Sequence, residues 1–217
     1  MSIIHKDIAS IREDYSKFSL DEKEVAENPV DQFQRWFNEA VNSKVIEPNA
    51  MVLSTVSEEG FPSSRVVLLK DIKPNGFSFF TNYYSRKAVS IENNDKVSLL
   101  FFWPELQRQV RVEGVVEKLP AEESDEYFSS RPKLSRLSAL ASPQSEIIDN
   151  RSFLQSRVET LRKQYEKSDY IPRPKHWGGY LVKPLRMEFW QGRSNRLHDR
   201  VEYIKRGHDW KIHRLAP

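Results

Sequence analysis

The sequence predicts a mainly β fold with peripheral helices, in which an antiparallel sheet is closed or nearly closed into a barrel. Short runs of alternating apolar residues recur along the 217-residue chain, and turn signals rich in Gly, Pro and Asn separate them. Helical stretches are inserted between groups of strands and do not follow each strand, so a doubly wound parallel sheet is not expected. Barrel closure would also remove the exposed edges that such short strands present.

Composition restricts the class of protein. Hydrophobic residues make up 38% of the chain and aromatic residues 12%, which is enough for a globular core, whereas 30% charged residues argue against a membrane-embedded chain. A net charge of +3 is too small to indicate general nucleic-acid binding, and no segment has the length of a signal-peptide core or a membrane span. Without cysteine there is no disulfide, thiolate nucleophile or cysteine-ligated metal. We therefore expect a soluble, cytoplasmic protein that partners neither membrane nor nucleic acid.

The chain begins with a polar arm, residues 1–28, which we expect to be partly mobile, and continues as one domain, residues 29–217. An amphipathic helix is predicted directly after the arm, because apolar residues recur there at helical spacing: Phe33, Trp36, Phe37, Ala40 and Val41.

Strand-like runs separated by turns follow this helix. They span residues 51–57, 64–70, 77–82, 96–103 and 107–118. Two helical stretches come next, residues 121–130 and 151–167, and a Ser-rich connector that holds Pro143-Gln144-Ser145 joins them. The chain then returns to strands at residues 179–190, 201–205 and 210–215.

Several common active-site motifs are absent from the sequence. The seven glycines form neither of the usual glycine-rich phosphate loops, so a bound phosphate must be held by cationic side chains and hydroxyls. There is no G-x-S-x-G turn for a serine hydrolase and no H-E-x-x-H spacing for zinc, and we expect no metal site.

Two segments supply cations and hydroxyls near strand ends. In Arg65-Val66-Val67-Leu68-Leu69-Lys70, two cations bracket an apolar strand core and face opposite sides of an ideal strand. Thr81 and Ser85-Arg86-Lys87 lie where a strand ends and a helix begins, so hydroxyls, cations and free helix amides converge there. A helix start with exposed charges is the alternative for the second segment.

The stretch from Arg186 to Arg200 sets four arginines, one histidine and one tryptophan around Gly192. Arginine recognises phosphate bidentately, histidine exchanges protons near neutral pH, and tryptophan offers a flat apolar wall. This combination suits a planar, phosphorylated ligand. An exposed basic strand end is the alternative, and Trp190 could be a plain core residue.

These segments together resemble the pyridoxine (pyridoxamine) 5'-phosphate oxidase family from Arg12 to Pro217. The similarity lies in the order and spacing of several motifs: R-V-V-L-L-K at 65–70, S-R-K-A at 85–88, R-Q-V-R-V-E-G at 108–114, Y-F-x-S-R-P at 127–132, Q-S at 144–145 and E-F-W-Q-G-x-x-x-R-L-H-D-R at 188–200.

The resemblance implies an FMN-binding split β-barrel and a homodimer with the FMN sites at the subunit interface. The residues that it assigns to FMN are Arg65, Val66, Lys70, Phe80, Thr81, Arg86, Lys87, Gln109, Gln144, Ser145, Trp190 and Arg200. Those that it assigns to the substrate are Arg12, Tyr15, Lys70, Tyr127, Arg131, Ser135, Arg196, Leu197 and His198. Arg196 and His198 are the catalytic candidates, and residues 12–15 resemble an arm that closes over the substrate.

The implied reaction is oxidation of pyridoxine 5'-phosphate or pyridoxamine 5'-phosphate at C4', with a hydride passing to flavin N5 and then to O2. The products are pyridoxal 5'-phosphate and hydrogen peroxide, with ammonia from the amine. The rivals are a split-barrel flavoprotein with another reductant and a non-catalytic module that binds flavin, pyridoxal phosphate or RNA. For Tyr127 and Arg131 the alternative is an exposed pair on a helix.

The sequence departs from the family pattern at three places. Phe80 stands where a tyrosine is expected, Ser194-Asn195 replaces the more usual Pro-Ser, and residues 137–140 replace a stretch that usually carries glycine and tryptophan. These differences bear on fine geometry more than on the type of reaction.

Overall fold

The computed structural model describes residues 14–217. Residues 1–13 of the predicted arm, which include the candidate substrate residue Arg12, lie outside this range. Contacts divide the chain into two compact units. The terminal unit comprises Met1–Pro48, Leu100–Val112 and Arg186–Pro217, and the central unit comprises Asn49–Leu99 and Glu113–Leu185. One domain over residues 29–217 stays a prediction.

The fold is mainly antiparallel β, as the sequence predicts. The strands are β1 (Ala50–Val56), β2 (Pro62–Leu68), β3 (Asp71–Lys73), β4 (Gly76–Asn82), β5 (Lys96–Trp103), β6 (Arg108–Lys118), β7 (Trp177–Gln191), β8 (Asp199–Arg206) and β9 (Asp209–Leu215). They form a nine-stranded sheet of order β2-β1-β5-β6-β7-β4-β3, to which β8 adds on β7 and β9 on β8. Residues of β5, β6 and β7 belong to both units.

The first predicted helix is confirmed as α2 (Pro29–Asn42). The side chain of Asn28 accepts a hydrogen bond from the Val30 N–H and caps the helix start. Pro29 suits the first turn because it has no backbone N–H that would need a partner there. Its apolar face buries Phe33 and Trp36 in the terminal unit, where Phe33 packs 4.7 Å from Phe101 between ring centroids.

A buried cation completes the terminal unit's core. The Arg108 guanidinium lies 4.4 Å from the Trp36 ring centroid and 4.9 Å from that of Phe18. It also donates to Gln191 Oε1 at 2.8 Å and pairs with Glu39. Both rings and both acceptors therefore compensate the burial of this charge.

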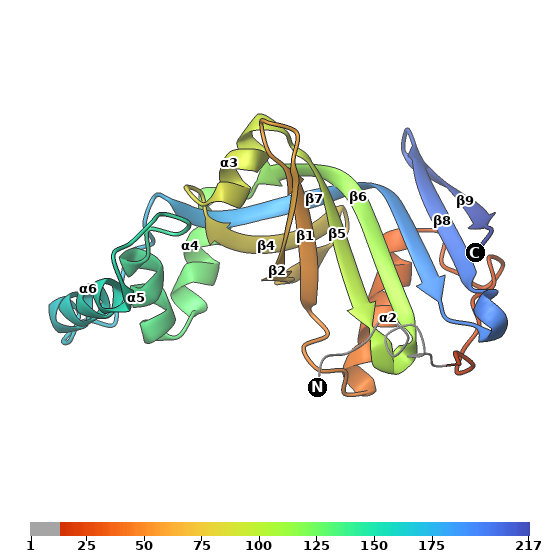
Figure 1. The fold of residues 1–217 in the computed structure, drawn as a ribbon, viewed down its shortest axis with the longest axis horizontal. Coiled ribbons are helices and arrows are strands. Elements are labelled where there is room, and N and C mark those ends of the chain that lie inside the picture. The colour runs from red at the N-terminus through yellow and green to blue at the C-terminus, as the bar shows by residue number, and fades with distance from the viewer. Residues whose placement is uncertain (1–13) are drawn as a thin grey trace, which may run out of the picture. The chain divides into compact units, whose positions relative to one another are not determined.

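The central unit holds four helices: α3 (Arg86–Asn93), α4 (Ala121–Ser130), α5 (Lys133–Ala141) and α6 (Arg151–Gln164). Residues from α4, α5 and α6 pack on a buried cluster of Phe128, Leu137, Ile171 and Trp177, and the three helices lie side by side in Figure 1. None of the helices in residues 14–217 is long and apolar enough to cross a membrane.

Helix α5 corrects the prediction of a connector between two helices. Its serines favour loops, but Ser138 lies on the exposed side of the helix and its hydroxyl donates to the Leu134 carbonyl oxygen at 2.9 Å. Leu137 is buried in the cluster, so tertiary packing determines the helix here.

Candidate functional site

A cavity of about 730 Å³ in the central unit gathers many of the predicted site residues. Those that line it are Val66, Lys70, Phe80, Thr81, Lys87, Tyr127, Arg131, Ser135 and Gln144. The cavity thus joins residues from β2, β4, α3, α4 and α5 with residues of the connecting segments, although they are distant in the sequence.

One group of cavity residues surrounds the junction of α4 and α5. Tyr127 lies in the last turn of α4, Arg131 caps it in an extended conformation before Pro132, and Ser135 lies in the first turn of α5. Lys70 follows the end of β2, and its Nζ lies 6.0 Å from the Tyr127 ring centroid. Tyr127 and Arg131 are half-buried cavity residues, not a fully exposed helix pair.

Arg131 carries a hydrogen-bond donor without a partner. Its guanidinium lies 4.6 Å from the Trp177 ring centroid, and NH1 is buried with no acceptor among the described residues. Burial lowers the pKa of Arg131, yet an arginine remains charged near neutral pH. A buried cationic donor that lacks an acceptor favours an anion in the cavity beside it.

A second group of cavity residues centres on Lys87, in the first turn of α3. Lys87 Nζ lies 3.2 Å from Thr81 Oγ1, 3.2 Å from Ser85 Oγ and 3.1 Å from Gln144 Oε1. Burial, together with the nearby charge of Arg65, lowers the pKa of Lys87 to about 8. These hydrogen-bond partners of the ammonium group are neutral oxygens, so a bound anion would stabilise its charged form.

The other predicted residues of the central unit lie around this group. Arg65 in β2 donates to the Leu53 carbonyl oxygen and to the hydroxyls of Thr55 and Ser63, and burial lowers its pKa. Arg86 and Ser145 line a neighbouring cavity of about 530 Å³, and Gln144 lines both cavities.

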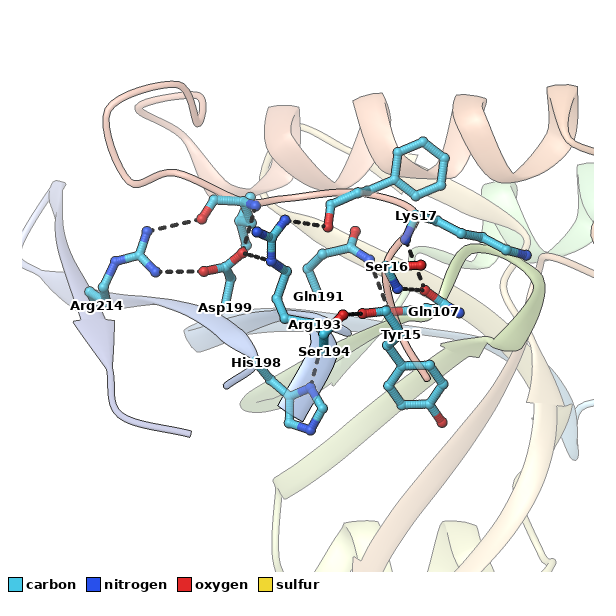
Figure 2. A network of polar contacts seen from close by, with 12 residues as sticks. Tyr15, Ser16, Lys17, Gln107, Gln191, Arg193, Ser194, His198, Asp199 and Arg214 are labelled. Atoms are coloured by element: carbon cyan, nitrogen blue, oxygen red, sulfur yellow. Dashed lines mark hydrogen bonds and ion pairs between the residues drawn. The ribbon is translucent and has the colours of Figure 1, made fainter. Parts of the chain in front are cut away.

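In the terminal unit three aromatic side chains come together at the end of β7, and Figure 2 shows two of them, Tyr15 and His198. The ring of Tyr15 lies 5.9 Å from both Trp190 and His198, and the last two rings lie 4.6 Å apart. Gly192 makes room for this cluster, because a Cβ there would lie 2.8 Å from Tyr15 Cγ.

His198 is held in one orientation. Its Nδ1 accepts a hydrogen bond from the Arg193 backbone N–H at 3.1 Å, so the proton of the neutral imidazole resides on Nε2. Burial lowers the pKa of His198, the charge of Arg196 lowers it further, and Asp199 opposes both effects. A neutral imidazole that donates from Nε2 is the favoured form at neutral pH.

Other predicted residues of the terminal unit differ in their surroundings. Arg196 and Leu197 are exposed around the short helix Ser194–Arg196, where Asn195 and Arg196 have φ of 56° and 62°. Arg200 instead forms a bidentate pair with Glu188 and donates to the Ala216 carbonyl oxygen. Gln109 lies half-buried in β6.

Trp177 is a cavity residue that the sequence did not single out. Its ring stacks with Phe80 at 5.5 Å and with Tyr127 at 6.2 Å, and Arg131 lies over it. Its position at the first residue of β7 gave no local signal, because apolar residues at strand ends commonly belong to the core.

Two family models match separate parts of the chain and together cover most of it. Residues 37–165 match pyridoxamine 5'-phosphate oxidase, and residues 177–217 match the pyridoxine 5'-phosphate oxidase C-terminal dimerisation region. The chain belongs to the pyridoxamine 5'-phosphate oxidase family. The resemblance predicted from the sequence motifs is confirmed.

Relatives within this oxidase family are similar over their full length. The chain is 53% identical over 211 residues to the pyridoxine/pyridoxamine 5'-phosphate oxidase of Bordetella pertussis, covering 97% of this chain and 99% of the relative. It is 48% identical over 212 residues to the enzyme of the same name from Salinibacter ruber, with 97% and 99% covered.

Solved structures of oxidase relatives share the fold. PhzG from Burkholderia lata 383, in complex with tetrahydrophenazine-1-carboxylic acid, has a TM-score of 0.88 and 30% identity, covering 94% of this chain and all of that chain. A pyridoxamine 5'-phosphate oxidase-related, FMN binding protein from Nostoc punctiforme has a TM-score of 0.68 and 16% identity, covering 85% and 97%, and shows the fold alone. The split β-barrel fold predicted from the sequence is confirmed.

Proposed function

We propose that this chain is an FMN-dependent oxidase that converts pyridoxine 5'-phosphate and pyridoxamine 5'-phosphate to pyridoxal 5'-phosphate with O2. Hydrogen peroxide is the second product, and the amine also releases ammonia. Membership of the pyridoxamine 5'-phosphate oxidase family and identities near 50% to pyridoxine/pyridoxamine 5'-phosphate oxidases support the reaction.

The observation that carries the substrate assignment is the buried Arg131 NH1 without an acceptor. Lys70, Tyr127 and Ser135 line the same cavity, so two cations and two hydroxyls are available to one anion. A phosphate monoester suits this set, because a dianion accepts several charge-assisted hydrogen bonds at once. These four residues therefore bind the substrate phosphate.

The chemistry of the lining also fits FMN. Lys87, Thr81 and Gln144 form a polar group around the half-buried ammonium of Lys87, and Arg65 and Arg86 add cations nearby. Val66 and Phe80 contribute apolar surface for a flat ring, with Lys70, Gln109, Ser145, Trp190 and Arg200 as the further contacts that the family pattern assigns. When bound there, FMN would supply the acceptor for a hydride from substrate C4' and the redox chemistry that reduces O2.

The terminal-unit residues orient the substrate in this proposal. Arg196 supplies an exposed guanidinium, and neutral His198 supplies a fixed N–H donor at Nε2. Trp190 and Tyr15 add flat apolar walls to the same cluster. Arg196 and His198 thus hold the pyridine ring so that the C4' hydrogen faces its acceptor.

A homodimer is the proposed assembly, with FMN sites at the subunit interface, and the match of residues 177–217 to a dimerisation region supports it. The proposed location is the cytoplasm, with neither membrane nor nucleic acid as partner.

A substrate panel tests this function. Flavin-loaded protein is given pyridoxine 5'-phosphate, pyridoxamine 5'-phosphate, unphosphorylated pyridoxine and a reduced phenazine carboxylic acid, and oxygen uptake is recorded. We expect uptake with the two phosphates, and far less with pyridoxine because Arg131 and Lys70 lose their ligand. Uptake with the phenazine alone would support a different split-barrel oxidase, and bound flavin without any uptake would support a non-catalytic module.

A further inference from the structure

We propose that Gln107 is a positioning residue that holds Tyr15 against Trp190 and His198. This inference rests on the proposed function, in which Tyr15 and His198 contact the substrate. Gln107 lies between the 3-10 turn Pro104–Leu106 and β6, in the terminal unit, and its side chain is buried.

The side chain of Gln107 binds the backbone of the segment that carries Tyr15 (Figure 2). Its Oε1 accepts from the Ser16 N–H at 3.1 Å and from the Lys17 N–H at 3.3 Å. Its Nε2 donates to the Asp14 carbonyl oxygen at 3.5 Å. One amide group thus fixes the backbone on both sides of Tyr15, where no regular secondary structure would do so.

The backbone of Gln107 binds the other side of the aromatic cluster. Its carbonyl oxygen accepts from the Gly192 N–H at 2.8 Å and from Gln191 Nε2 at 3.2 Å. Gly192 is the residue against which the Tyr15 ring packs. Gln107 therefore links the Tyr15 segment directly to the end of β7 that precedes His198.

The backbone conformation of Gln107 makes this double role possible. Gln107 has φ 54° and ψ 41°, in the left-handed region that few non-glycine residues adopt, and its N–H bonds the Pro104 carbonyl oxygen at 3.0 Å. A left-handed residue costs conformational energy, which the five hydrogen bonds of its side chain and carbonyl oxygen offset.

Half-buried Ser194 and exposed Lys17 make further contacts with the same segment. Ser194 Oγ lies 3.2 Å from the Tyr15 carbonyl oxygen, and Lys17 Nζ donates to the Glu105 carbonyl oxygen at 2.8 Å. Exposed hydrogen bonds exchange with water and contribute less than buried ones. The buried side chain of Gln107 makes three hydrogen bonds to this segment and is therefore its main anchor.

Three variants test the anchor. Gln107→Met keeps the length of the side chain and removes all its hydrogen bonds, whereas Gln107→Glu retains the acceptor for Ser16 and Lys17. Lys17→Met removes one exposed bond of the same segment and is the matched control. Flavin content, kcat and KM for pyridoxine 5'-phosphate, and the rate of trypsin cleavage after Lys17 are measured for each, with Lys17→Met omitted from the cleavage assay.

Loss of the three hydrogen bonds of the Gln107 side chain predicts a KM about five- to thirtyfold higher in Gln107→Met, with kcat changed less and flavin content unchanged. Cleavage after Lys17 is expected to accelerate, because it requires local release of the segment. The KM of Gln107→Glu should lie much closer to the wild-type value than that of Gln107→Met. The KM of Lys17→Met should stay within about twofold of the wild-type value.

A wild-type KM in Gln107→Met would contradict the proposal that Gln107 holds the Tyr15 segment. An equal rise of KM in Gln107→Met and Gln107→Glu would contradict it as well. If Gln107→Met does not fold, Gln107→Asn replaces it, because Asn tolerates the left-handed backbone but is one methylene too short to reach both N–H groups. Absence of turnover in the wild-type protein would instead contradict the proposed function. The role of Gln107 would then be tested by the cleavage rate alone, which should be higher in Gln107→Met than in the wild type.

Discussion

His198 Nδ1 accepts a hydrogen bond from the Arg193 backbone N–H at 3.1 Å, which assigns the imidazole a single neutral tautomer. Protonation of Nδ1 would place two donors face to face and break this bond. Burial and the charge of Arg196 act in the same direction and lower the pKa of His198. The imidazole is therefore a directional N–H donor, not a cation, at neutral pH.

The first prediction concerns the titration of His198. Its pKa in the folded protein is expected below the ordinary value near 6.5, and the 15N chemical shifts should show the proton on Nε2. Because the unfolded chain binds the proton more readily, the stability contributed by this group is complete above the unfolded pKa. It declines as pH falls from there toward the folded pKa. A pKa above 6.5, or a proton on Nδ1, would contradict the assigned hydrogen bond.

The second prediction concerns Lys87 and flavin affinity. Because the pKa of Lys87 is lowered to about 8, its side-chain amine is mostly charged below that pH and mostly neutral above it. FMN binding, followed by quenching of flavin fluorescence, should therefore weaken between pH 7 and pH 9 in the wild type. Gln144, Thr81 and Ser85 can equally bind an arginine, so Lys87→Arg should abolish this dependence. The same dependence in both proteins would exclude Lys87 as its source.

Substitution of Arg131 should weaken substrate binding without lowering the stability of the protein. Arg131→Gln removes a buried donor without an acceptor, so the melting temperature should stay unchanged or rise. The KM for pyridoxine 5'-phosphate should rise about tenfold to hundredfold, since a charge-assisted hydrogen bond is lost. Thermal unfolding and steady-state kinetics on the same preparation check both effects. A lower melting temperature with an unchanged KM would make Arg131 a structural residue.

Arg108 should contribute to stability. Arg108→Met removes the bond to Gln191 and the ion pair with Glu39, which is expected to cost about 1–3 kcal/mol in urea unfolding. Lys118→Met is the control, because its pair with Glu92 is exposed on both sides and should contribute less than about 1 kcal/mol. Equal losses of unfolding free energy in the two variants would show that the rings and acceptors around Arg108 add no stability beyond that of an exposed ion pair.

Much of the fold follows from local patterns. The helical spacing of Phe33 and Trp36 predicts α2, and the alternation through Val110 and Val112 predicts β6, because in each case one face must be buried. Helix α5 was missed, since its serines imitate a loop and Leu137 becomes decisive only once Phe128 and Trp177 pack on it. Lys70 lies beyond the end of β2 and not inside the predicted strand.

The candidate site was predictable in residue type but not in arrangement. Cations and hydroxyls at strand ends indicated phosphate binding, yet the grouping of Lys70, Arg131 and Ser135 in one cavity depends on long-range packing. The left-handed conformation of Gln107 has no sequence signal, because it depends on hydrogen bonds to residues 14–17 and 191–192. Arg12 lies outside the described residues and stays a prediction.

Pyridoxal 5'-phosphate formation tests the central claim most directly. Purified protein is loaded with FMN, mixed with pyridoxine 5'-phosphate in air, and assayed for aldehyde and hydrogen peroxide. We expect one peroxide for each pyridoxal 5'-phosphate formed, with turnover lost in Arg196→Ala at unchanged flavin content. Protein that retains FMN and yet forms no aldehyde from either B6 phosphate would contradict it.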